Sequence, residues 1–311
     1  MTWHDEASLL GRLEALSGPG MALRVVGRTV QGREIPAVKV GFGGAGRPQV
    51  LLTANVHGTE VIGSEVALAV LDLLTATEPT PVVRDLLAIA DVTVLPAVNL
   101  DSRAPAVAAL GRGACWARAP RGNAHGVDLN RNFPFVAGSV DAWHPLAGSR
   151  FRRLPWYRGP EPLSEPESRA VADLAQTLRP AAAVGLHSVG RLFLHPWSAH
   201  PEPPAAQAAF EAMGAAFARS QPGPKYAIKQ ARAWYTILGD MDDWLYDAFG
   251  TLAVTVELGR VLEGLRTHPW RLGSPAAWMN PADPAGIIAE SALPCLHALL
   301  EGARRACEGR P

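Results

Sequence analysis

The sequence predicts an α/β fold, because short apolar strands alternate with helices along most of its 311 residues. Three runs carry this prediction: residues 49–54, 91–96 and 251–256 are rich in aliphatic and β-branched side chains, as buried strands are. Segments with apolar residues at helical spacing lie between them. No linker rich in Gly, Ser or Pro is long enough to divide the chain, so we expect a single domain over residues 1–311.

The first third of the chain alternates between helix and strand. Leu9 and Leu13 recur at helical spacing, and the turn residues from Ser17 to Gly20 end that pattern, which predicts an amino-terminal helix within residues 1–20. Gln31-Gly32-Arg33 is a turn signal between two strands. The elements expected up to residue 96 are helices over 5–17, 61–74 and 82–90, and strands over 23–26, 35–40, 49–54 and 91–96.

Residues 100–162 differ from the rest, because they hold many Gly, Arg, Pro and Trp and few periodic apolar residues. We expect no regular element there, and a long irregular segment in a compact domain usually carries function. Ser164 and Glu167 then form a capping box that opens a helix. The later elements expected are helices over 166–178, 205–218, 240–249 and within 285–308, and strands over 181–186, 191–195 and 251–256.

The composition narrows the class of partner. With 29 basic and 29 acidic residues, the chain lacks the positive charge that would attract nucleic acid or an anionic membrane. It has no apolar run of about 18 residues and no leader pattern at its start, so the sequence predicts no membrane span and a cytoplasmic location. Cys115, Cys295 and Cys307 are too few and scattered for a disulfide framework, and we expect free thiols.

Ionisable side chains follow three of the predicted central strands. His57 and Glu60 follow the first, His187 the second, and Glu257 the third. Sites in α/β sheets form beyond the carboxyl ends of the strands, so these groups are expected to meet. Two imidazoles and one carboxylate give Zn²⁺ three ligands and leave a fourth position for water, and a carboxylate such as Glu257 can take the proton of that water.

Two alternatives remain at this point. A lone His-x-x-Glu is common, and Glu60 at a helix start is also favoured by the helix dipole. His125 and Asp128 form a competing metal pair with similar spacing, but no buried strand precedes them.

Four motifs in order make this sequence resemble the zinc metallocarboxypeptidase (funnelin) family, and its bacterial members in particular. The motifs are His57-x-x-Glu60, Gly126-Val127-Asp128-Leu129-Asn130-Arg131-Asn132, His187-Ser188 and Thr255-Val256-Glu257-Leu258. The resemblance covers roughly residues 25 to 262. It implies a zinc-carboxypeptidase-like fold, in which a mixed, twisted central sheet is flanked by helices on both faces.

The resemblance also implies roles for single residues. His57, Glu60 and His187 would bind Zn²⁺, and Glu257 would be the general base. Asn130 and Arg131 would hold the terminal carboxylate of the substrate, since a guanidinium and an amide offer it several donors. The ligand His would donate a hydrogen bond to Asp128, which fixes its tautomer.

Three further residues match family positions by motif or spacing. Arg121 would stabilise the developing oxyanion, with Arg118 as the alternative. Tyr235, which lies twenty-two residues before Glu257, would cap the substrate; Tyr226 does not fit that spacing. Asp242 would lie in the pocket for the terminal side chain and favour a cation there. The alternative is that Asp240, Asp242 and Asp243 only mark a helix start.

The predicted function is zinc-dependent hydrolysis of a carboxyl-terminal peptide or amide bond, with a peptide or murein-peptide substrate. The sequence also resembles bacterial murein-peptide amidases, which cut the bond between γ-D-glutamate and diaminopimelate, and this activity is an alternative. Hydrolysis of a small N-acyl amino acid, as by aspartoacylase-type enzymes, is a second alternative. A carboxypeptidase-like module that only binds is a third, although no ligand or base is missing. The oligomeric state is not predicted.

Overall fold

The computed structural model describes residues 3–18, 20–44, 46–112, 119–139, 146–260, 266 and 269–308. Within these residues, eight strands form one sheet in the order β1-β2-β4-β3-β5-β8-β6-β7. The strands are β1 (Ala22–Arg28), β2 (Glu34–Val40), β3 (Gln49–Ala54), β4 (Asp91–Leu95), β5 (Ala182–Ser188), β6 (Leu192–His195), β7 (Ala227–Gln230) and β8 (Leu252–Leu258). Arg118 and Cys115 lie outside the described residues.

The sheet is mixed, as predicted. Strands β4, β3, β5 and β8 are parallel neighbours, so their carboxyl ends lie at one edge. β1 and β2 pair antiparallel, and so do β2 and β4 and β6 and β8. In the β5–β8 ladder His187 pairs with Glu257, and this register sets two of the predicted site residues side by side.

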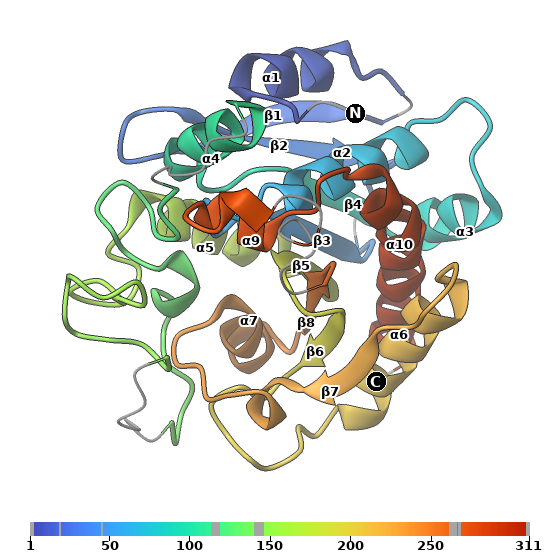
Figure 1. Cartoon of the computed structure of the whole chain (residues 1–311). Helices are drawn as coiled ribbons and strands as arrows, with labels where there is room; N and C mark the ends of the chain where they lie inside the picture. The colour runs from blue at the N-terminus through green and yellow to red at the C-terminus, as the bar shows by residue number, and fades with distance from the viewer. Residues whose placement is uncertain are drawn as a thin grey trace.

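Helices cover both faces of the sheet (Figure 1). Alternate residues of β3 face opposite ways: Val50 and Leu52 join the core with α2, α3, α6 and α10, whereas Leu51 joins the core with α5 and α7. The helices are α1 (Glu6–Ala15), α2 (Ile62–Leu74), α3 (Pro81–Ile89), α4 (Leu100–Arg112), α5 (Pro166–Leu178), α6 (Gln207–Ser220), α7 (Met241–Phe249), α9 (Pro275–Met279) and α10 (Ala285–Glu308), with short 3₁₀ turns at Leu129–Arg131, Ala231–Ala233 and Pro269–Arg271.

The expectation of no regular element over residues 100–162 was wrong at its start, where α4 forms. Its buried face is made largely of small side chains, Ala106 and Ala109 with Leu110, that pack against Val61. Small alanines give a weak apolar pattern, and Pro105 within the helix further obscures it. The short elements β7 and α9 were also not predicted.

The predicted capping box was wrong too. The cap residue of α5 is Glu165, and its side chain makes no cap hydrogen bond. Ser164 donates to Glu165 instead (Oγ–Oε1 2.8 Å), while Glu167 accepts from the backbone of Val30 in the β1–β2 turn (N–Oε1 3.0 Å). These acids therefore tie α5 to other segments of the fold.

The composition predicted no membrane span and free cysteine thiols. None of the helices in the described ranges has the length and apolar content needed to cross a bilayer. Cys295 is buried and Cys307 exposed, and both are free thiols as expected.

Candidate active site

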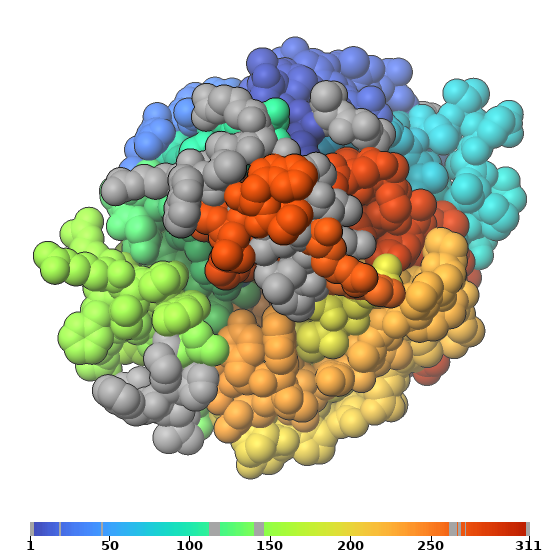
Figure 2. Space-filling model, viewed as in Figure 1, coloured from blue at the N-terminus to red at the C-terminus, as the bar shows by residue number. Residues whose placement is uncertain are grey.

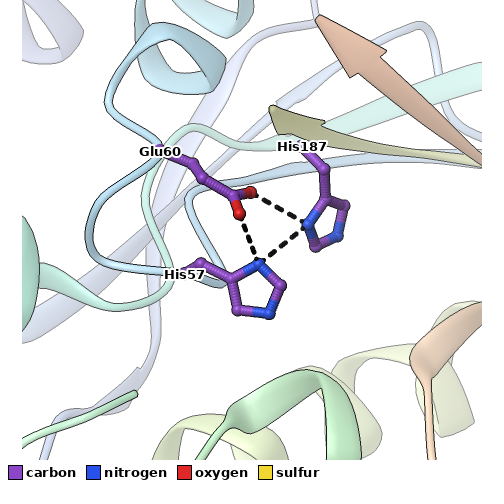
Figure 3. Close-up of side chains that lie close together, drawn as sticks. All are labelled: His57, Glu60 and His187. Atoms are coloured by element: carbon purple, nitrogen blue, oxygen red, sulfur yellow. Dashed lines mark hydrogen bonds and ion pairs between the residues drawn. The ribbon is translucent and has the colours of Figure 1, made fainter. Parts of the chain in front are cut away.

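Three buried side chains converge at the carboxyl edge of the sheet. His57 lies in the turn after β3, Glu60 lies just before α2, and His187 lies in β5. The Nδ1 atoms of His57 and His187 are 3.1 Å apart, and they lie 2.8 and 3.0 Å from the two oxygens of Glu60 (Figure 3). Two imidazole nitrogens and a carboxylate in this arrangement are a donor set that Zn²⁺ accepts.

The charge on Glu60 suits this role. Burial raises the pKa of its carboxyl, but the interactions with His57 and His187 outweigh burial and hold the pKa below its usual range. The backbone N–H of Ser188 also donates to Glu60 (3.1 Å). Glu60 is therefore ionised at neutral pH, as a metal ligand must be.

Asp128 lies behind His57, where a buried partner can orient the ring. Its Oδ1 is 3.0 Å from His57 Nε2, and its Oδ2 accepts from Arg121 Nε (2.9 Å). Arg121 also reaches Glu60 (Nη1–Oε1 3.3 Å). Burial raises the pKa of Asp128, but the charge of Arg121 more than offsets it, so the pKa lies well below the usual range. An ionised Asp128 favours the tautomer of His57 that carries its proton on Nε2 and leaves Nδ1 free for a metal.

The competing pair of His125 and Asp128 does not form. His125 is half exposed and its Nδ1 lies 2.8 Å from Glu165, whereas Asp128 is directed to His57 and Arg121. Among the described residues, the group of three that can share a metal is His57, Glu60 and His187.

Glu257 lies beside the metal group and opens on the same cavity. Its side chain is buried, and its Oε2 has no hydrogen-bond partner within the described part of the chain. Burial, and then the charge of Glu60, raise its pKa to about 7. The cavity is about 160 Å³, and Met279 at the end of α9 is one of its lining residues. Helix α9 lies near the centre of the face shown in Figure 2.

Arg131 is a fully buried cation at the wall of this cavity. Its Nε and Nη2 donate to the carbonyl of Leu146 (3.2 and 3.1 Å), and its Nη1 donates to the carbonyl of Asn130 (2.7 Å). In the described ranges no carboxylate lies at ion-pair distance from it. Asn130 accepts from the Met241 N–H at the start of α7 (3.0 Å), so its amide nitrogen is the group left to donate to a ligand.

Tyr235 also lines the cavity, in the loop between the second 3₁₀ turn and α7. The guanidinium carbon of Arg131 lies 6.0 Å from the centre of its ring. Trp234 packs against the same ring edge to face, with the ring centres 4.8 Å apart. Tyr226, the competitor by sequence, is buried away from the cavity and donates to Glu290 (2.9 Å).

The three acids at the start of α7 have different surroundings. Asp243 accepts from the backbone N–H groups of Ser198 and Ala199 and from the Ser198 hydroxyl. Asp242 lines the cavity, where its Oδ2 accepts from Thr255 Oγ1 (2.6 Å) and its Oδ1 has no partner among the described residues. Burial raises the pKa of Asp242 to about 6, although the Thr255 hydrogen bond opposes the change.

Sequence reasoning missed two members of this pocket. Thr255 holds Asp242, and Asp240 lines the cavity with a buried Oδ1 that has no partner among the described residues. A signal for Thr255 was present, because it lies two residues before Glu257 and so on the same face of β8. Asp240 carried no comparable signal, since acids are common at helix starts.

The profile of the zinc carboxypeptidase family matches residues 8–268 of this chain. The chain belongs to this family. Its family relatives include human carboxypeptidase Z, which is 27% identical over 269 residues, a match that covers 76% of this chain and 40% of that protein. They also include carboxypeptidase B of Astacus astacus, which is 27% identical and for which the match covers 83% of this chain and 86% of that protein. The chain thus spans about two fifths of the length of carboxypeptidase Z.

Several solved structures have the same fold. Bovine thrombin-activatable fibrinolysis inhibitor superposes with a TM-score of 0.74 at 18% identity, covering 99% of each chain. A murein-tripeptide amidase from Escherichia coli O157 superposes with a TM-score of 0.51 at 22% identity, covering 91% of this chain and 100% of that one. The zinc-carboxypeptidase-like fold is therefore confirmed, and Zn²⁺ is the metal that the family assigns to the His57, Glu60 and His187 group.

Proposed function

We propose that the chain is a zinc-dependent carboxypeptidase that releases the last residue of a peptide. One observation carries the proposal: the buried guanidinium of Arg131 has no carboxylate partner among the described residues, and it lines the same cavity as the metal group. A buried cation that donates to carbonyl groups and has no carboxylate at ion-pair distance among the described residues is poised to bind an anion. The terminal carboxylate of a peptide supplies that anion, and Asn130 adds a donor beside it.

The chain's own residues then divide the reaction between them. A bound Zn²⁺ would lower the pKa of a water and polarise the carbonyl of the scissile bond. Glu257 accepts the proton of the attacking water and passes it to the leaving amine. Arg121 donates to the oxygen that becomes negative as the bond is attacked. Arg131 and Asn130 hold the carboxylate, so that the last peptide bond is the one in reach.

Asp242 supports a preference for a cationic terminal side chain. Asp242 lines the cavity, and its buried Oδ1 has no hydrogen-bond partner among the described residues, so a positive group in the cavity would lie near a carboxylate that has little other solvation. A second candidate is amidase activity on murein peptides, because diaminopimelate also presents an amine and one structural neighbour is a murein-tripeptide amidase.

A substrate panel tests the proposal. Zinc-loaded protein is incubated with N-benzoylglycyl peptides that end in Arg, Lys, Phe or Leu and with a murein tripeptide, and kcat/KM is compared. We expect hydrolysis of the Arg and Lys peptides, loss of activity with a chelator and recovery with Zn²⁺. Glu257→Gln is the matched control, since it should keep the metal and lose hydrolysis.

Two outcomes would contradict parts of the proposal. If the peptides ending in Phe and Leu were cleaved as fast as those ending in Arg and Lys, or faster, Asp242 would not select a cationic terminal residue. Cleavage of the murein tripeptide alone would favour the amidase.

A further inference from the structure

The turn that carries Glu60 is held by a side chain from a distant part of the chain. Asn280, which directly follows α9, is 2% exposed. Its Oδ1 accepts a hydrogen bond from the Ile62 N–H (2.8 Å), and its Nδ2 donates to the Thr59 carbonyl (2.7 Å). These two backbone groups lie one residue before and two residues after Glu60, so a single amide brackets the metal ligand.

Asn280 does more than cap a helix. The cap position of α2 is Val61, whose side chain makes no cap hydrogen bond. Asn280 supplies the missing acceptor to the first residue of that helix, from 218 residues away in the chain. The bond to the Thr59 carbonyl is not part of a cap, because Thr59 precedes the helix. The amide therefore fixes the turn as well as the start of α2.

The amide of Asn280 is itself held in place. Its Nδ2 also donates to the carbonyl of Ala276 in α9 (2.7 Å), so the nitrogen has two acceptors and the oxygen has a donor. A buried amide that is engaged on both its nitrogen and its oxygen keeps one orientation. Replacing it by an apolar side chain would take this partner away from the Thr59 carbonyl and the Ile62 N–H.

The preceding residue attaches the same segment to the second histidine of the metal group. Ser188 directly follows His187, and its hydroxyl donates to the Met279 carbonyl (2.7 Å). The N–H of Ser188 donates to Glu60 Oε2 (3.1 Å). Met279 and Asn280 therefore connect the turn after β3 with the end of β5, and these are the two segments that supply the metal group.

A second amide supports the same turn through different atoms. Asn55 lies immediately after β3, and its Nδ2 donates to the carbonyls of His57 (2.9 Å) and Glu60 (3.4 Å). Asn280 engages Thr59 and Ile62 instead. Backbone groups of all four residues thus receive a side-chain partner, as expected where the positions of metal ligands must be fixed before the ion binds.

We propose that Met279 and Asn280 form a clamp between the two ligand-bearing segments, and that Asn280 is a positioning residue for Glu60. Asn280 acts through the backbone of the turn and is not itself a ligand. Since the inference concerns the zinc site that the family assigns, it does not depend on which peptide the protein cleaves.

Two variants test the role of Asn280 through zinc affinity, which is measured by competition with a chromogenic chelator. Asn280→Ala removes the amide. Gln221→Ala is the matched control, because Gln221 is also a buried amide that accepts from a backbone N–H, of Tyr226 (2.9 Å), and donates to a carbonyl, of Glu290 (3.3 Å), but both partners lie outside the ligand-bearing segments. We expect Asn280→Ala to bind zinc about 10- to 100-fold more weakly, the usual loss when a group that holds a metal ligand is removed. Gln221→Ala should bind zinc as tightly as the wild type.

A third variant tests the other attachment of the clamp. Ser188→Ala removes the hydroxyl bond to Met279 but keeps the backbone N–H that contacts Glu60. We expect zinc binding to weaken by about two- to tenfold, the size of one hydrogen bond. This variant is the milder one, and it decides the proposal if Asn280→Ala does not fold.

The cobalt-loaded proteins give a readout that a general loss of stability does not move. The visible absorption of Co²⁺ reports the arrangement of its ligands. We expect a changed spectrum in Asn280→Ala and a wild-type spectrum in Gln221→Ala, with circular dichroism confirming that each protein is folded.

Other outcomes would overturn the clamp. Wild-type zinc affinity in a folded Asn280→Ala would mean that Asn280 only caps α2. An equal loss in Gln221→Ala would mean that the removal of any buried amide loosens the site. If Asn280→Ala does not fold, wild-type zinc affinity in Ser188→Ala would refute the proposal.

Discussion

Each buried charge near the cavity has a different set of partners, and those partners define what it can do. Glu60 contacts both histidines, Asp128 contacts His57 and Arg121, and Asp243 contacts backbone N–H groups. Arg131 lacks a carboxylate partner within the described residues. Asp128 and Asp243 are therefore expected to position other groups, whereas we propose that Arg131 is available to a substrate.

Arg121→Ala should lower kcat without releasing the metal. Removing one preorganised oxyanion donor typically costs about 10²–10³ in rate, because the developing charge is then left unpaired. The zinc content, measured by mass spectrometry of the metal, should stay at the wild-type level, since Arg121 contacts Glu60 and Asp128 and is not itself a ligand. Near-normal kcat would transfer the role to Arg118.

The preference for a cationic terminal residue should depend on pH. Burial raises the pKa of Asp242 to about 6, so its carboxyl is ionised above that pH and neutral below it. The ratio of kcat/KM for Lys-ended to Phe-ended peptides should therefore fall as the pH decreases from 8 to 5. The titration of catalytic groups such as Glu257 changes kcat/KM for both peptides by the same factor, so its effect cancels in the ratio. Asp242→Asn should give a ratio that is flat over this range, and a wild-type ratio that is also flat would contradict the assignment.

At the scale of elements, Asn132 organises the irregular segment that precedes α5. It is fully buried, and it lies immediately after Asn130 and Arg131. Its Nδ2 donates to three acceptors and its Oδ1 accepts from two donors. These partners are the carbonyls of Arg158 and Glu161, the hydroxyls of Ser164 and Ser168, and the N–H of Glu165. The last residue of the Asn-Arg-Asn motif thus supports the two that line the cavity.

Asn132→Ala should reduce the free energy of unfolding by about 3 kcal/mol or more, since several buried groups lose their partner. Denaturant unfolding would measure this change. Asn132→Asp is an informative comparison, because it keeps the acceptor but loses the donors to the two carbonyls, and it should also be destabilised. A change below about 0.5 kcal/mol in both variants would show that the segment does not depend on Asn132.

At the scale of the whole molecule, the sheet concentrates acidic groups at one edge. Glu60, Glu257 and the acids of α7 are buried together beyond the carboxyl ends of the parallel strands. Burying carboxylates whose oxygens remain unpartnered opposes folding. We therefore expect the pocket to reduce the stability of the fold in exchange for affinity.

Asp242→Asn should stabilise the protein at pH 8. A carboxyl pKa of about 6 in the folded state, against 3.8 for an ordinary Asp, corresponds to about 3 kcal/mol of destabilisation above pH 6, which vanishes below about pH 4. Since Asn can still accept from Thr255, the variant should have a higher Tm at pH 8, and the difference should shrink as the pH falls towards 4. Calorimetry across this range would measure it, and a lower Tm at pH 8 would contradict the account.

Much of the fold was readable from local patterns. The strands that flank the metal group and the amphipathic helices were predicted, because apolar periodicity reports directly on burial. The helix α4 was missed because alanines and a proline weaken that periodicity. The predicted capping box was wrong because Glu167 accepts a hydrogen bond from Val30, which is 137 residues away in the chain. A local sequence pattern contains no information about such distant partners.

The sequence by itself determined the family, through His57-x-x-Glu60, the Asn130-Arg131-Asn132 run, His187 and Glu257, because these motifs specify the metal and the residue types around it. It also identified Asp242 but left its direction open. Only the tertiary structure decided that Asp243 is a structural anchor, while Asp240 and Asp242 line the cavity and each has a buried Oδ1 without a hydrogen-bond partner among the described residues. The physical reason is that the hydrogen-bond partners of these acids, Ser198 for Asp243 and Thr255 for Asp242, lie on other segments of the chain. Such partners distinguish acids that are neighbours in the sequence.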